Sequence, residues 1–414
     1  MNVVEKTNLL SSLVLPTETT SRKEAKLALE TMGLPTNKTE EYKYTAITRL
    51  LEKHFESLTP TPIASDIAIG DFLIKDLDAH ILVFINGIFS KKHSSFDAQD
   101  VSIRLLSHEL EEKNSTNTDP FALLNDATYN HGILVEVKNN VMVSKPIVIH
   151  HISDARTASI VTASRNTIQL GKSSQVSLIE KYDSVGEVNF STSVNEITVA
   201  ENAGLTYTLI QNDAGQRIQF NQTTIHQQRN SRVDCFTLSL NGKLIRNNLN
   251  LIIDGEGVDS HMNGLYLLTG ETIADNHTVV DHRKPNSQSN ELYKGVMDGN
   301  SKGVFNGKIY VRPDAQKTNA FQSNRNILLS DKATVNTKPQ LEIWADDVKC
   351  SHGCTSGQLD EEALFYLQSR GISKDSARAL LLYAYAGEVI DKIQNEPLRT
   401  YIDSLVGERL HKNF

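Results

Sequence analysis

The stretches LNLIIDGEG (residues 249–257) and GLYLLTGETIAD (residues 264–275) each join a short run of Leu and Ile to a turn of small and polar residues. Such runs are typical of β-strands, and the turn residues suit tight reversals of the chain. Similar turns recur throughout residues 131–345, most of them about 15 or about 30 residues apart. This long regular period favours a β-solenoid, or β-helix, because a β-sandwich closes after fewer strands.

The chain divides by pattern into three regions. Residues 1–128 are predicted to form an N-terminal helical α/β region, residues 129–346 the β-helix core, and residues 347–414 a C-terminal helical region. Within the first region, a β-hairpin is predicted to turn at Asn86-Gly87. The expected fold class is therefore mainly β, with the two flanking regions capping the open ends of the solenoid.

Composition excludes several classes of protein. The 414 residues carry a net charge of −8, whereas a nucleic-acid-binding surface is usually basic. No apolar run approaches the ~18 residues of a membrane span, and the first residues do not resemble a secretory signal. Three cysteines are too few for a disulfide framework, so we expect a cytoplasmic protein that binds neither nucleic acid nor membrane.

Two cysteines lie where the strand pattern gives way to the helical one, in VNTKPQLEIWADDVKCSHGCTSG (residues 335–357). In an extended segment Cys350 and His352 point to the same side, close to the carboxylates of Asp346 and Asp347. A thiol and an imidazole suit a soft metal or sulfur site, but four protein ligands are usual. Two interpretations stay open: a partial site completed by a second chain or a ligand, and a structural pair with Cys350 as a buried hydrophobe.

Other familiar chemistry is missing from the sequence. There is no phosphate-binding G-x-x-x-x-G-K-[ST] loop, no G-x-S-x-G elbow and no H-E-x-x-H motif. Asp275, His277 and Asp281 share strand parity, but we interpret them as ladder or surface residues because isolated histidines are rarely ligands. Cys235 is interpreted as a core residue.

Three segments resemble one known family. They are GLPTNKTEEYKYT (residues 33–45, with Tyr42 where the family usually has tryptophan), the long stretch at residues 282–372, and the helical tail. They resemble the SufB/SufD family of scaffold components of the SUF iron–sulfur cluster assembly system. The EEYKYT signature and the scarcity of cysteines indicate the SufD branch of that family.

The resemblance implies more than the patterns do. It implies that the core is a right-handed parallel β-helix that pairs with a SufB-like paralogue. It also implies that the C-terminal helices dock a SufC-like ATPase, and that a nascent iron–sulfur cluster forms at the interface of the paralogues. Cys350 and His352 match the family's Cys-Ser-His segment and become candidate metal ligands, while the role of Cys354 stays open. Reduced flavin is associated with the assembled complex, and no cofactor is expected to bind stably to this chain alone.

Three functions are compatible with the sequence. The first is a non-enzymatic scaffold for iron–sulfur cluster assembly, which we expect. The second is a β-helix enzyme acting on polysaccharides or transferring acyl groups, which normally shows a secretory signal or a strict hexapeptide repeat. The third is a homodimeric metal-binding β-helix module, in which Cys350 and His352 of two copies form one four-ligand site.

Overall fold

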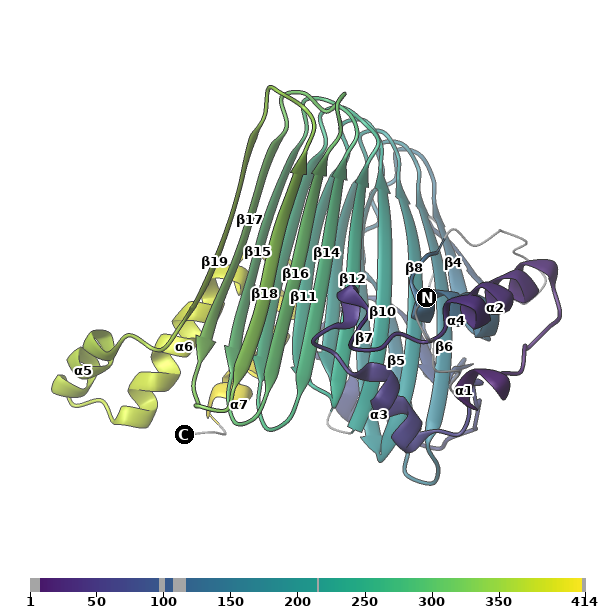
Figure 1. The fold of residues 1–414 in the computed structure, drawn as a ribbon, viewed down its shortest axis with the longest axis horizontal. Coiled ribbons are helices and arrows are strands. Elements are labelled where there is room, and N and C mark those ends of the chain that lie inside the picture. Colours follow the sequence, from purple (N-terminus) through teal and green to yellow (C-terminus); the bar gives the residue numbers. More distant parts are fainter. Residues whose placement is uncertain (1–7, 97–100, 107–116, 214–215, 412–414) are drawn as a thin grey trace.

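The computed structural model describes residues 8–96, 101–106, 117–213 and 216–411. Within them, the strands form two long sheets that face each other (Figure 1). Sheet one contains, in spatial order, β19 (Lys349–Gly357), β17 (Asn319–Leu328), β15 (Gln288–Met297), β13 (Asp259–Leu268), β11 (Arg232–Asn241), β9 (Gly204–Asn212), β7 (Gln175–Gly186), β5 (Ile147–Ala155), β1 (His80–Ile85) and β2 (Ile88–Phe89). Sheet two contains β18 (Thr334–Ile343), β16 (Lys302–Val311), β14 (Ile273–His282), β12 (Leu244–Ile253), β10 (Gln216–Gln227), β8 (Val188–Val199), β6 (Ile160–Leu170), β4 (His131–Val137) and β3 (Val101–Leu105).

From β4 onward, successive strands alternate between the two sheets and pair in parallel with the strand one turn away. Leu244 pairs with Ile273, and Ile273 pairs with Lys302, so each of these turns takes 29 residues. The half-turn from one sheet to the other explains the shorter spacing of the turns in the sequence. The predicted β-solenoid is confirmed, and so is the hairpin at Asn86-Gly87, where β1 and β2 pair antiparallel and both turn residues have positive φ.

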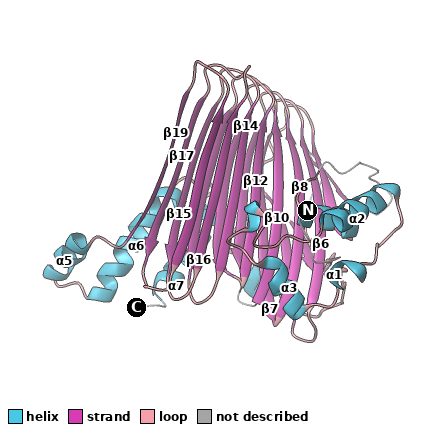
Figure 2. Cartoon of the chain, viewed as in Figure 1, coloured by secondary structure: helices cyan, strands magenta, loops and turns pink. Residues whose placement is uncertain are grey.

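The helices cover the outer faces of the two sheets (Figure 2). The helices are α1 (Asn8–Ser11), α2 (Thr20–Met32), α3 (Ile47–His54), α4 (Pro120–Thr128), α5 (Glu361–Ser369), α6 (Lys374–Ile390) and α7 (Glu396–His411), with 3-10 turns at Glu40–Tyr42 and Gly70–Phe72. Helices α1 to α4 pack on sheet two, for example against Phe190 and Phe220. Helices α6 and α7 pack on sheet one, for example against Leu238 and Leu265. None of the described helices has the length and hydropathy needed to cross a bilayer.

This arrangement corrects two expectations. The flanking helices were expected to cap the ends of the solenoid, but they bury the apolar outer faces of strands, which would otherwise be exposed to water. In addition, the C-terminal helical region was expected to begin at residue 347, yet the first helix of this region, α5, begins at Glu361, and Lys349–Gly357 form strand β19. Its segment KCSHGCTSG has almost no aliphatic residues, but its backbone continues the ladder by pairing with β17.

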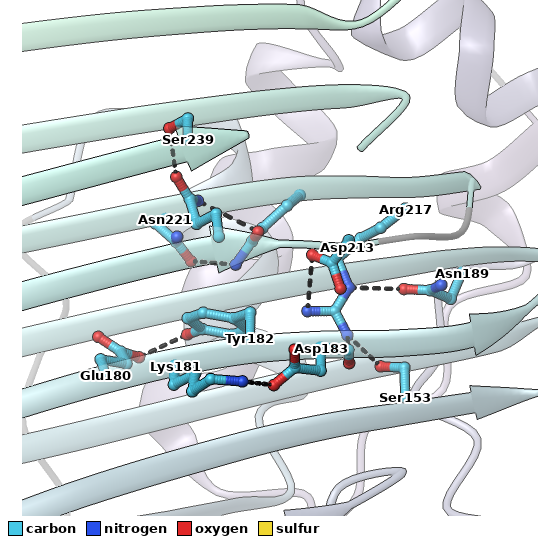
Figure 3. Close-up of polar contacts among 12 residues, drawn as sticks. Ser153, Glu180, Lys181, Tyr182, Asp183, Asn189, Asp213, Arg217, Asn221 and Ser239 are labelled. Atoms are coloured by element: carbon cyan, nitrogen blue, oxygen red, sulfur yellow. Dashed lines mark hydrogen bonds and ion pairs between the residues drawn. The ribbon is translucent and has the colours of Figure 1, made fainter. Parts of the chain in front are cut away.

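The space between the sheets is a packed core that also contains polar side chains. Figure 3 shows several of them near the first turns, including the contact between Glu180 and Tyr182. Glu180 also accepts hydrogen bonds from Ser193, Asn195 and Tyr207. Burial alone would raise the pKa of Glu180, but interactions with His151 and the two tyrosines outweigh burial and lower it. This carboxylate is therefore ionised and structurally satisfied inside the core.

A second inward-facing glutamate lies in a different environment. Glu291 on β15 is 5% exposed and accepts one hydrogen bond, from Gln322 Nε2 at 2.8 Å. Its Oε1 has no partner in hydrogen-bond geometry among the described residues. Burial raises the pKa of Glu291 to about 7, although Thr278 and Gln322 partly offset the effect. Glu291 is therefore largely neutral in the folded protein below that pH.

We predict that Glu291→Gln stabilises the protein at about pH 8. The folded-state pKa lies above the ordinary value of 4.5, so the wild-type protein loses stability as the pH rises from the ordinary value through about 7. This pH-dependent loss in the free energy of unfolding is roughly 3 kcal/mol at most, and it is absent from the Glu291→Gln variant. Urea unfolding at about pH 5 and about pH 8 measures it.

Glu180→Gln is the matched control, because it replaces an inward glutamate whose pKa is lowered. We expect this control to be less stable than the wild-type protein at about pH 8. A Glu291→Gln variant with the same pH dependence as the wild-type protein would contradict the assignment.

Candidate functional site

The last turn of the solenoid is uncovered. Strand β19 pairs only with β17, and β18 pairs only with β16, so each has one edge without a β partner in the described chain. Figure 1 shows these strands at the end of the stack away from the N-terminal helices. We call β18 and β19 together the open end. The long edges of two strands remain available there for pairing with another chain.

Cys350 and His352 lie on the same face of β19, as strand parity predicted. Cys350 is the register partner of Ala320, and His352 is the partner of Gln322. Ala320 and Gln322 are both buried between the sheets, so Cys350 and His352 face inward across the open end. Cys354 shares this face as the partner of Asn324 and is exposed. The solenoid thus places three soft or borderline ligands in one row.

The two principal side chains differ in their surroundings. Cys350 is half-buried and packs against the core, whereas His352 is exposed. Burial raises the pKa of the Cys350 thiol, and a backbone hydrogen bond from Ala320 partly offsets the rise. The thiol of the isolated chain therefore stays protonated at neutral pH, and it must lose that proton to bind a metal.

The open end does not assemble a complete metal site by itself. Among the described residues, no group of three or more His, Cys, Asp or Glu side chains is arranged to hold a metal ion. The aspartates expected near the pair, Asp346 and Asp347, are exposed in the turn that precedes β19. The backbone of Asp347 is bonded there to Gln316 and Lys317. Assignment of Cys350 and His352 as metal ligands stays a prediction.

Features that the sequence did not single out surround this pair. Trp344 at the end of β18 is 49% exposed and stacks on Tyr310, with Arg312 packed over both rings. Phe321 and Ile343 are also exposed nearby. Isolated exposed apolar residues are ordinary, but several on the last turns indicate a contact surface. These exposed residues are separated in the sequence, and only the register of the strands shows that they lie on the same last turns.

A groove of about 820 Å³ runs along the outer face of sheet one. Its lining includes His261, Asn290, Phe321 and Ser351, together with the link between α6 and α7 at residues 392–394. The lining also includes Glu291, Gln322 and His352, so the groove extends to the candidate ligand on β19. Its lining is mixed in polarity.

The cluster around His277 has a structural role. Glu41 accepts a hydrogen bond from Lys308 at 2.6 Å, and His277 Nδ1 lies 3.3 Å from it. Arg246 donates to the Glu41 carbonyl and packs over the ring of Tyr42. These contacts attach the EEYKYT segment to the outer face of sheet two. The interpretation of His277 as a ladder or surface residue agrees with this placement, and Cys235 is in the core, 2% exposed, as predicted.

Comparisons with known proteins agree with the geometry. Residues 151–385 match the family model "SUF system FeS cluster assembly, SufBD core domain", and residues 4–149 match the model "SufBD protein N-terminal region". The core match therefore spans the solenoid from β5 through β19 and extends into α6.

Individual relatives extend along most of the chain. An iron–sulfur cluster assembly SufBD family protein of Synechocystis is 31% identical over 88% of this chain and 85% of its own length. The iron–sulfur cluster assembly protein SufD of Escherichia coli is 30% identical over 91% of this chain and 90% of its own length. SufD of Bacillus subtilis is 27% identical over 69% of this chain and 66% of its own length. The chain therefore belongs to the SufBD family of the SUF system and has a role in iron–sulfur cluster assembly.

Proposed function

We propose that this protein is a non-enzymatic scaffold subunit for iron–sulfur cluster assembly in the cytoplasm. The open end pairs with a SufB-like paralogue, and the C-terminal helices dock a SufC-like ATPase. The nascent cluster is the cargo of this assembly and forms where the two paralogues meet. The observation that carries the proposal is an inward-facing thiol and imidazole on an uncovered terminal strand.

The ligand arithmetic supports a shared site. Cys350 and His352 supply one thiolate and one imidazole, which is half of a usual four-ligand shell. A partner strand placed against the open end would bring its own side chains to the same row. Metal binding to Cys350 releases the proton that burial favours, so cluster formation is promoted as the pH rises.

The edges and the apolar side chains of the last turns support a protein partner. Strand β19 has nine residues and an unpaired edge, which is long enough for β-strand addition. Strand β18 contains Pro339, which lacks a backbone donor, so β19 offers the less interrupted ladder. Trp344 and Ile343 at the end of β18 supply the apolar contacts that such an interface needs.

A different surface supports docking of the ATPase. Helix α6 buries one side on sheet one through Ala386 and Val389, and Lys294 and Arg325 pair with Glu388 beneath it. The remaining surface of α5 and α6 exposes four large side chains: Phe365 (72%), Tyr366 (57%), Leu380 (51%) and Tyr383 (42%). Aromatic and apolar side chains of this kind dominate the binding energy of protein interfaces.

The homodimeric metal-binding module is the second candidate, because the same open end could meet a copy of itself. Two copies would supply two thiols and two imidazoles, which also makes four ligands. The molecular mass of the purified chain, measured with and without metal and with and without the two proposed partners, separates the two candidates. A metal-dependent homodimer that excludes the paralogue would favour the module.

We predict that Cys350→Ser and His352→Ala each lower the yield of cluster on the complete complex at least roughly tenfold. Each change removes one of the two ligands that this chain contributes. His352 is exposed, and serine keeps nearly the size of the half-buried Cys350, so the packed core is little altered. Iron and acid-labile sulfide per complex measure the yield. Ser351→Ala is the control, since it alters the outward-facing neighbour on the same strand. Wild-type yield in both ligand variants would remove these residues from the site.

We also predict that the double variant Leu380→Asp/Tyr383→Asp weakens binding of the ATPase by roughly 30-fold or more, which corresponds to about 2 kcal/mol. Calorimetric titration of the purified ATPase into this chain measures the effect. Met142→Asp is the matched control, because Met142 is 71% exposed but lies far from α5 and α6 in the sequence and on another part of the solenoid. Unchanged affinity of the double variant for the ATPase would show that the ATPase docks on another surface.

A further inference from the structure

Three successive turns place Glu291, Gln322 and His352 in one inward row of sheet one. Glu291 on β15 is the register partner of Gln322 on β17, and Gln322 is the partner of His352 on β19. Neighbouring strands in a sheet are about 4.8 Å apart, so side chains of this row can touch across consecutive turns. The row leads from the exposed imidazole at the open end to a carboxyl group buried two turns below it.

The amide of Gln322 is held in one orientation. Its Nε2 donates to Glu291 Oε2 at 2.8 Å, and an ionised Glu291, which can only accept hydrogen bonds, requires this orientation of the amide. On the opposite sheet the position beneath the amide is Gly307, where a Cβ atom would lie only 2.0 Å from Gln322 Nε2. The glycine therefore leaves the space that the amide occupies, and Glu291 determines which end of the amide is the oxygen.

The oxygen of this amide lacks a partner. Gln322 is 3% exposed, and its Oε1 accepts no hydrogen bond from the residues that the structure describes. Some other buried acceptors of the described residues, such as Asn125 Oδ1, also lack a partner, whereas Glu180 accepts four hydrogen bonds. Buried acceptors are normally paired. The next side chain of the row that can donate is His352, whose neutral ring always carries one N–H.

We propose that Gln322, anchored by Glu291, accepts the ring N–H of His352 and so directs the other ring nitrogen toward the cluster site. Gln322 and Glu291 are positioning residues, because they act through His352 and do not touch the cargo. Histidine ligands of metals commonly donate their second ring nitrogen to such an acceptor, which selects the tautomer and the ring orientation. The inference rests on the proposed role of His352 as a ligand, and it adds what holds that ligand in place.

The experiment observes the tautomer of His352 directly in the full chain. Histidine-labelled protein is examined by ¹⁵N NMR at about pH 8, where an ordinary imidazole is neutral, and the His352 signals are assigned by their loss in His352→Ala. We expect one predominant tautomer in the wild-type protein and an average of both in Gln322→Met, which keeps the length of the side chain but removes the acceptor. Ser323→Ala, the outward neighbour of Gln322, is expected to leave the tautomer unchanged.

The double variant Glu291→Gln/Gln322→Glu exchanges the carboxylate and the amide of these two positions. It tests whether the hydrogen bonds from position 291 through position 322 to His352 can form with the two groups in reverse order. The amide at position 291 can donate to the carboxylate at position 322, which still accepts from His352, so a single tautomer should return. Binding of Co²⁺, followed by the thiolate-to-cobalt absorption band, should weaken about tenfold in Gln322→Met and recover in the double variant. If Gln322→Met does not fold, the double variant tests the inference: a single predominant tautomer of His352 supports it, and an average of both tautomers contradicts it.

Averaged tautomers in the wild-type protein, or no change of tautomer in Gln322→Met, would overturn this inference. Failure of the proposed function looks different: Cys350→Ser and His352→Ala would then leave the cluster yield of the complex unchanged, whatever the NMR signals of His352 show.

Discussion

The structure depends on parallel pairing of each strand with the strand one turn away. This ladder satisfies the backbone of every internal turn, but it cannot satisfy the last one, since β18 and β19 have no further turn to pair with. Proteins generally cover such an edge, interrupt it or pair it with another chain. Here the helices cover the outer faces of the sheets and leave the end uncovered. The unpaired edge and the inward-facing candidate pair, Cys350 and His352, therefore share one origin, the termination of the solenoid.

The same stacking explains why buried polar groups occur between the sheets. Residues in register on successive turns form rows, so a polar side chain is satisfied when the rows next to it supply donors and acceptors. Glu180 lies deep in the stack and has such neighbours on several strands. Glu291 and Gln322 lie closer to the open end, and each keeps an unpartnered oxygen. Unpartnered buried atoms also occur on earlier turns, for example Asn189 Nδ2 and Ser191 Oγ on β8, so satisfaction of a polar side chain depends on its own neighbours.

Much of the fold could be predicted from the sequence because the turns are local signals. The regular spacing of Gly, Asp and Asn turns indicated the solenoid, and Asn86-Gly87 indicated the hairpin. That helices cover the outer faces of the sheets could not be predicted. A strand that is buried on both faces has a continuous apolar sequence, which does not show which side chains face the space between the sheets and which face the helices. Strand β19 was placed outside the β-helix core because KCSHGCTSG has no aliphatic pattern, and only its pairing with β17 makes it the last strand of the solenoid.

The candidate site was predictable only in part. Strand parity placed Cys350 and His352 on one face, and that needed no knowledge of the other strands. The link to Gln322 and Glu291 depends on the register between turns of slightly different length, which local patterns do not determine. The exposed surface of α5 and α6 was likewise obscured, because Leu380 reads as part of an apolar stripe but is 51% exposed.

Hydrogen–deuterium exchange of residues 349–357, in the chain alone and in complex with the SufB-like paralogue, tests the central claim most directly. The claim is that the end of the solenoid is completed by another subunit. Strong protection of the β19 amides that appears only in the complex is the predicted result. A complex in which these amides exchange as fast as in the isolated chain, with protection elsewhere, would contradict it.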